Sequence, residues 1–277
     1  MRARFALAPA ALISLAACGG GGPAGPPGLA YSLPTPTTVT YATGDTVNMD
    51  IDAGGDRMQA RTTGTSTLKA GFTRAPGGLQ VAVDVIHLDG RLSTPLSSAS
   101  ADEAGIEGPL VFTMDRRGAV TLVSQPELSG AASQFFIPVQ LAHSLFPRLP
   151  GRAARMGDQW TDTIAFEGAR GPGTVGTSTI LTYTVAGDTV VGGRSLVRLD
   201  LAGTSESRAS GVMTGMDFSQ SVEGTIEGWV LFDVGRSLMV ESYTEGDLRG
   251  SMDVSAAPFP LGVRLRSRSR VKLQDSM

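Results

Sequence analysis

Apolar and polar residues alternate one by one over long stretches of this chain. In residues 44–55, Val47, Met49 and Ile51 occupy every second position, with polar residues between them. Successive side chains of a β-strand point to opposite faces, so this alternation is typical of strands with one buried face. Gly-rich turns separate the alternating runs. The pattern predicts a mainly β protein built from antiparallel strands.

Blocks of this pattern recur along the chain in the same order, offset by a little over a hundred residues. The matched pairs are 44–55 with 157–168, 63–85 with 175–201, and 107–118 with 227–237. We predict two duplicated antiparallel β-sheet units. They would either stack as a sandwich or join into one curved open sheet or partial barrel.

The segment 126–150, which lies between the two units, has a different periodicity. Its apolar residues recur at steps of three and four, which predicts a helix with an apolar stripe formed by Leu128, Ala132, Phe135, Val139, Ala142 and Phe146. Pro138 should kink or restart this helix, and Pro147 should end it. One interpretation is a helix packed as core. The other is a lid over an apolar cavity lined by Phe135, Phe136, Val139, Leu145 and Phe146.

The N-terminal residues 1–17 contain Arg2 and Arg4, no acidic residue, and an apolar run too short to span a bilayer. They predict a signal peptide. Leu15-Ala16-Ala17-Cys18 resembles the lipobox of bacterial lipoproteins. The resemblance implies that Cys18, the only cysteine, is lipidated and becomes the first residue of the mature chain. Gly19 in place of an aspartate implies sorting to the outer membrane; the alternative is an ordinary secretory signal.

Composition then changes to a Gly- and Pro-rich stretch, residues 18–38, which predicts a tether. The expected organisation is therefore a signal peptide (1–17), the lipidated tether (18–38), a first β unit (39–125), the helical connector (126–150) and a second β unit (151–277). The stretch 145–160 resembles a pattern in uncharacterised envelope lipoproteins, in which a helix leads into a Pro-Gly turn and a Gly-Asp-x-Trp strand. That resemblance implies a β-rich lipoprotein and no catalytic residue.

Candidate chemistry is sparse. Of the two histidines, His87 continues the alternation of the preceding valines, and His143 is only adjacent in sequence to Ser144, which places no base against a nucleophile. Asp50, Asp52 and Asp56 lack the spacing and closing glutamate of a calcium loop. Further acids are interpreted as surface charges: Asp217, Glu223, Glu227 and Asp233. We expect no metal and no cofactor.

Two tryptophans, Trp160 and Trp229, fall in the second β unit. We interpret them as core residues that pack together. Aromatic residues make up only 6% of the chain, which gives no support to a carbohydrate-stacking groove.

The C-terminal stretch 263–274 alternates cations with small or apolar residues. As a strand, it would place five cations on one face: Arg264, Arg266, Arg268, Arg270 and Lys272. After removal of residues 1–17 the chain has 21 basic and 26 acidic side chains, a net charge of −5. The cationic face predicts either an edge strand that resists edge pairing or a contact surface for anionic lipid or envelope polymer.

Taken together, the sequence favours a non-enzymatic envelope lipoprotein, held to a membrane by its N-terminal lipid, that binds an apolar or amphiphilic ligand or an envelope component. The alternative is a structural or assembly partner acting through its sheet surface and basic C-terminal strand. A hydrolase with a non-motif acidic site is less favoured, a transmembrane β-barrel less still, and nucleic acid is not an expected partner.

Overall fold

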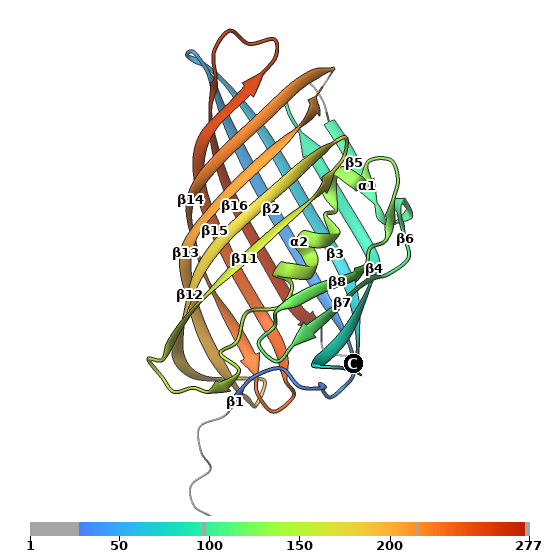
Figure 1. The fold of residues 1–277 in the computed structure, drawn as a ribbon, viewed down its shortest axis with the longest axis vertical. Helices are drawn as coiled ribbons and strands as arrows, with labels where there is room; N and C mark the ends of the chain where they lie inside the picture. Colours follow the sequence, from blue (N-terminus) through green and yellow to red (C-terminus); the bar gives the residue numbers. More distant parts are fainter. Residues whose placement is uncertain (1–27, 96–97, 214, 275–277) are drawn as a thin grey trace, which may run out of the picture.

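The computed structural model describes residues 28–95, 98–213 and 215–274, most of which lie in one strongly curled antiparallel sheet (Figure 1). The strands of the first half are β1 Gly28–Leu29, β2 Thr38–Ala53, β3 Asp56–Ala75, β4 Gly78–Ser93, β5 Ser98–Asp102, β6 Ile106–Glu107, β7 Leu110–Asp115, β8 Val120–Ser124 and β9 Glu127–Leu128. Those of the second half are β10 Arg152–Ala153, β11 Gln159–Arg170, β12 Gly173–Val191, β13 Arg194–Met213, β14 Met216–Asp233, β15 Leu238–Val254 and β16 Leu261–Gln274. Its helices are the one-turn η1 Glu103–Gly105, α1 Ala132–Phe135 and α2 Pro138–Ser144.

The sheet runs in the order β11-β12-β13-β14-β15-β16-β2-β3-β4-β7-β8, with β5 paired to β4. The prediction of a mainly β protein with a curved sheet is confirmed. Both predicted units belong to this single sheet, so the sandwich alternative is wrong. The matched sequence blocks fall in β2, β3–β4 and β7 of one half, and in β11, β12–β13 and β14 of the other. The duplication itself stays a prediction.

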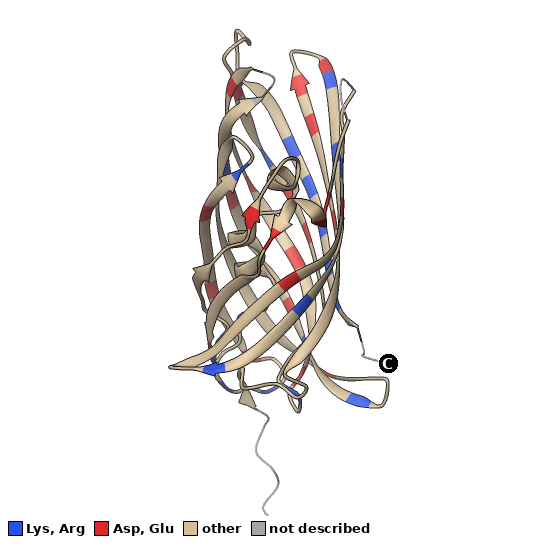
Figure 2. Ribbon diagram, turned by 90° about the vertical axis from the view of Figure 1, so that its right-hand side faces the viewer, with Lys and Arg blue, Asp and Glu red and all other residues tan. Residues whose placement is uncertain are grey.

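Alternation along the strands assigns one face to the inside of the curl and the other to the outside. Tyr41 on β2 pairs in register with Leu68 on β3, and both are fully buried on the inner face. The next residue along β2, Ala42, faces outward beside Lys272 of β16. The outer face therefore takes the polar side chains, and charged residues of both signs are spread over its strands (Figure 2).

The gap between the two edges of the curled sheet is occupied by the helical segment. α2 contacts β11 on one side and β7 and β8 on the other. The helix predicted over 126–150 is shorter and broken, because Ile137 is extended and Pro138 starts a new helix at its first position. The close approach of α2 to β11 requires glycine at position 168 of β11, because a Cβ there would lie 2.4 Å from Cγ1 of Val139 in α2.

The core lies inside the curl, around Phe146 just after α2. Its ring is 2% exposed and makes edge contacts with the rings of Tyr31, Tyr41 and Phe72, at centroid distances of 5.7–6.0 Å. The buried tyrosines satisfy their hydroxyls on backbone: Tyr31 donates to the Pro147 carbonyl at 3.0 Å and Tyr41 to that of Met239 at 3.1 Å. None of the helices in the described residues is long and apolar enough to cross a membrane.

Candidate functional site: the outer face around β16

The basic C-terminal strand, β16, lies in the middle of the sheet. It pairs with β15 on one side and with β2 on the other, so the prediction that it is an edge strand is wrong. Its five cations do point to one face, as the alternation predicts, and that face is the outer one. Arg266, for example, lies between Asp247 of β15 and Asn48 of β2.

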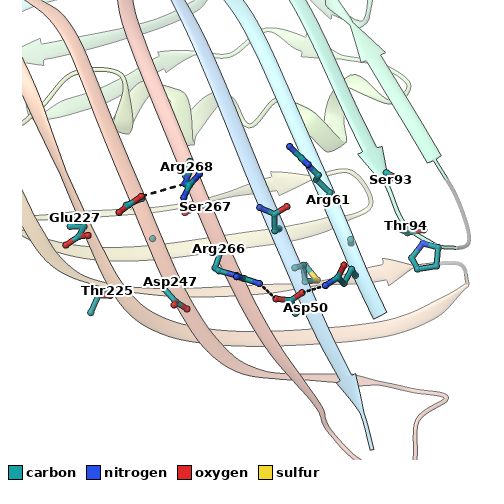
Figure 3. A pocket seen from close by; sticks show the side chains of 17 residues that line it. Asp50, Arg61, Ser93, Thr94, Thr225, Glu227, Asp247, Arg266, Ser267 and Arg268 are labelled. Atoms are coloured by element: carbon teal, nitrogen blue, oxygen red, sulfur yellow. Dashed lines mark hydrogen bonds and ion pairs between the residues drawn. The ribbon is translucent and has the colours of Figure 1, made fainter. Parts of the chain in front are cut away.

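Acidic residues on the neighbouring strands neutralise most of this cationic row. Arginine–carboxylate pairs link β16 to both of its neighbours: Arg264 with Asp247, Arg266 with Asp50, Arg268 with Glu245, and Arg270 with Glu241. The Arg264–Asp247 pair has two bonds, with Nε of the arginine 2.9 Å from Oδ1 and a second from Nη2 to Oδ2. The row is therefore a cross-strand ion-pair ladder (Figure 3).

The ladder stabilises the ionised form of two of its acids, Asp50 and Asp247. The hydrogen bond from Arg266 holds the pKa of Asp50 below its usual value, and the bond from Arg264 does the same for the pKa of Asp247. The same pairing raises the pKa of Arg264. All three groups stay charged at neutral pH, so they hold and orient charge and are unsuited to proton transfer there.

A hollow of about 930 Å³ lies over this ladder, from β14 to the end of β4 (Figure 3). Its acidic lining residues are Asp50, Glu227, Glu245 and Asp247, and its basic ones are Arg61, Arg266 and Arg268. Within the described residues, Arg61 on β3 and Glu227 on β14 have no ion pair. Four strand spacings separate these two strands, which is about 19 Å across the sheet. The hollow thus has unpaired charges of opposite sign toward its two sides.

The residues predicted to line an apolar cavity lie at the helical segment inside the curl. Leu145 and Phe146 are buried in the core, Phe136 and Val139 are also buried, and Phe135 is half-buried over Gly90. Core packing accounts for the apolar character of Leu145 and Phe146. Their role as ligand contacts stays a prediction.

Within the described residues, neither histidine is hydrogen-bonded to a serine hydroxyl. A bulge at Ile86 moves His87 to the outer face, where its Nδ1 is 3.3 Å from Oε2 of Glu103, so the predicted continuation of the valine face is wrong. His143 stacks on Phe166, and burial lowers the pKa of its ring. The Ser144 hydroxyl donates to the Gln140 carbonyl at 2.8 Å, within its own helix.

The carboxylates singled out in the sequence are separated. Asp50 belongs to the ladder, and Asp52 accepts a bond from the backbone N–H of Gly55 at 3.0 Å in the adjoining turn. No group of metal-binding side chains occurs among the described residues. Asp233, predicted to be a surface charge, is buried instead and pairs with Arg236 at 2.7 Å.

The two tryptophans lie on opposite faces of the sheet, so the prediction that they pack together is wrong. Trp160 faces inward, stacks on Tyr183 and donates to the Arg148 carbonyl at 3.0 Å. Trp229 faces outward, stacks on Tyr243 and lies under Arg198.

Asp45 is the inner-face residue that the sequence reasoning missed. It is exposed to solvent although it points into the curl, and it pairs in register with Ser269. Surrounding protein raises the pKa of its carboxyl, and the hydrogen bond to Ser269 partly opposes this. Alternation did signal its direction, because it shares the face of Val47 and Met49. Cys18 lies outside the described residues, so the structure leaves its lipidation a prediction.

No family model and no curated protein matches this chain. Among solved structures, it is similar to Neisserial surface protein A, with 9% identity over 84% of this chain and 96% of that one and a TM-score of 0.23. It is also similar to OccK5 of Pseudomonas aeruginosa (8% identity, 85% and 98% covered, TM-score 0.25) and to a mutant porin of Rhodopseudomonas blastica (10% identity, 86% and 100% covered, TM-score 0.19). TM-scores this low do not establish a common fold, and the roles of these proteins are not transferred to this chain.

Proposed function

We propose that this chain is a non-enzymatic cell-envelope lipoprotein, anchored through Cys18 to the outer membrane, that binds a polar envelope component on the outer face of its curled sheet. The observation that carries this is the charged hollow over the β16 ladder. Its ion pairs are spread over three adjacent strands, so they present a fixed pattern of charge on a rigid surface. Such pre-organisation favours binding, because little order is lost when a partner docks.

The charge of the hollow defines the class of partner. It has one more acidic than basic side chain, so we extend the expected partner from an anionic polymer to one that carries groups of both signs. Arg61 would meet a carboxylate or phosphate and Glu227 an amine, on opposite sides of the hollow. A cell-wall polymer with free carboxylates and amino groups has this chemistry.

The polar outer face also bears on the manner of membrane attachment. A transmembrane barrel needs an apolar band about 25 Å tall on its outside. Here the outer face at mid-height carries the charged ladder on β15, β16 and β2. A lipid on Cys18 would hold the protein to the membrane without any strand crossing it.

The test is co-sedimentation of the full lipidated chain with isolated cell-wall polymer. The double variant Arg61→Ser, Glu227→Gln should lose most of the binding, since it removes the unpaired charges and leaves the ladder intact. The control is Arg208→Ser, Glu223→Gln, at two outer-face sites beyond that hollow. Equal sedimentation of both variants and the unchanged chain would exclude the hollow as the binding site.

A second candidate is an amphiphilic ligand inside the curl. The observation that favours it is Asp45, exposed on an inner face that also carries apolar residues such as Met49 and Leu265. A basic headgroup on Asp45 and a chain along that apolar wall would fit. Native mass spectrometry of the detergent-free chain tests this: an added mass that denaturation releases supports it, and a bare chain mass counts against it.

A further inference from the structure

The described part of the chain begins at one end of the curled sheet, which we call the barrel from here on, beside a group of arginines. Gly28 and Leu29 pair with Ala153 and Arg152, and the backbone N–H of Tyr31 donates to the Arg116 carbonyl at 2.8 Å. Nine residues lie between Gly28 and the expected lipid on Cys18, which makes ten steps from Cα to Cα. Ten residues span at most about 35 Å when fully extended. A lipid on Cys18 would therefore keep this end of the barrel close to the bilayer. We call it the tether end; it is the end where β1 lies (Figure 1).

Apolar side chains are strongly exposed at the tether end. Met156 is 78% exposed, Val190 71% and Val191 47%. Met156 lies in the loop before β11, and the two valines end the adjoining strand β12. The Gly157 N–H donates to the Val185 carbonyl at 2.8 Å, and a Cβ on Gly187 would lie 3.9 Å from the Met156 sulfur. Exposure of such side chains to water costs free energy, and contact with the acyl region of a bilayer would remove that cost.

Cations accompany these apolar groups. Arg116, Arg152 and Arg155 are exposed at this end. The nearby acids are the exposed Asp115 and Asp188, and Asp158, whose Oδ2 is 3.6 Å from Nη1 of Arg152. Arg117, in a turn, and Arg194, at the start of β13, lie at the same end and bring the arginines to five against these three acids. The balance is basic, which suits the phosphates of an anionic bilayer surface. By contrast, four of the five β16 cations are paired with acids. Their contact with an anionic surface stays a prediction.

We propose that the tether end lies on the membrane surface, with Met156, Val190 and Val191 in the interfacial region and Arg116, Arg152 and Arg155 at the lipid headgroups. This rests on the proposed anchoring through Cys18. The barrel then stands upright on the bilayer, and the hollow over β16 faces sideways into the surrounding space. The loop that carries Phe259, at the opposite end of the barrel, points away from the membrane (Figure 1).

The single native cysteine makes a direct test available, because an acylated Cys18 does not react with thiol labels. Val190→Cys and, as matched control, Phe259→Cys are each labelled with an environment-sensitive fluorophore in the full lipidated chain. The labelled chains are reconstituted into phosphatidylethanolamine vesicles containing phosphatidylglycerol. We expect the label at residue 190 to shift to the blue and to become about tenfold less accessible to an aqueous quencher. The label at residue 259 should remain as accessible as in detergent-free solution.

Equal quenching at both positions would overturn the proposed orientation. The mass of the same preparations shows whether Cys18 carries acyl chains. A chain without them would refute the anchoring itself, whereas a lipidated, vesicle-bound chain with an aqueous label at residue 190 would refute only the orientation. A label on Met156→Cys tests the loop before β11. If the label at residue 190 is protected from the quencher and the label at residue 156 is not, the two segments do not enter the membrane interface together.

Discussion

Replacing Phe146 by alanine tests whether the helical segment is core or a lid over a ligand cavity. Four aromatic rings, those of Tyr31, Tyr41, Phe72 and Phe112, lie within 6.3 Å of its ring centroid, and the side chain is 2% exposed. Truncation of a buried phenylalanine costs about 3–5 kcal/mol. Because three of the surrounding rings, those of Tyr41, Phe72 and Phe112, belong to strands of one sheet, the site has little freedom to collapse, and we expect a loss of about 4 kcal/mol.

The assay is urea unfolding followed by near-ultraviolet circular dichroism, with the free energy of unfolding compared at constant m-value. Phe259→Ala is the matched control, since Phe259 is 49% exposed and its truncation should change stability by no more than about 0.5 kcal/mol. Phe146→Leu should fall between the two and remains measurable if the alanine variant does not fold. A Phe146→Ala loss equal to that of the control would refute core packing and favour the lid.

Three further outcomes follow from the contacts described above. Asp233→Asn leaves Arg236 half-buried without a counter-charge and should lower the free energy of unfolding by about 2–3 kcal/mol. The control, Asp200→Asn, removes one partner of an exposed pair and should cost at most about 1 kcal/mol. Equal losses in the two variants would contradict a stabilising role for the buried pair. Gly168→Ala forces a Cβ against the helical segment and should lower the urea midpoint, whereas Gly44→Ala, with open space around it, should not. The pKa of Asp45 is raised in the folded state, so the free energy of unfolding should fall as pH rises above about 4 and the carboxyl ionises. Asp45→Asn should make this fall smaller. A pH profile of stability identical to that of the unchanged chain would contradict the prediction.

Alternation in the sequence was enough to predict which side chains share a face. The five cations of 263–274 do lie on one face, and Val47, Met49 and Ile51 do lie on the other face of the sheet. Alternation contains no information about which strands become neighbours. The position of β16 between β15 and β2, and hence the acids beside each arginine, depends on long-range pairing that no local pattern specifies.

Errors arose where one residue broke a period. The bulge at Ile86 reversed the phase of β4, so His87 turned outward although the preceding valines face inward. Pro138 divided a continuous apolar stripe into two short helices. Asp233 looked like a surface acid because its burial depends on Arg236 within a tight turn, and sequence alone does not reveal that the turn is covered.

The placement of the last strand in the middle of the sheet has a consequence for how the molecule is made. β16 is synthesised after β2 and β15, yet it joins the strand that follows the tether, β2, to the meander that ends with β15. Until residues 261–274 are available, the chain forms two separate meanders with unpaired edges facing each other. Closure therefore waits for residues 261–274 and depends on their contact with β2, more than 200 residues earlier, which is a slow kind of folding step. A chain cut before Leu261 would lose the seam that unites its halves, and would be left with two exposed edges prone to pair with other chains.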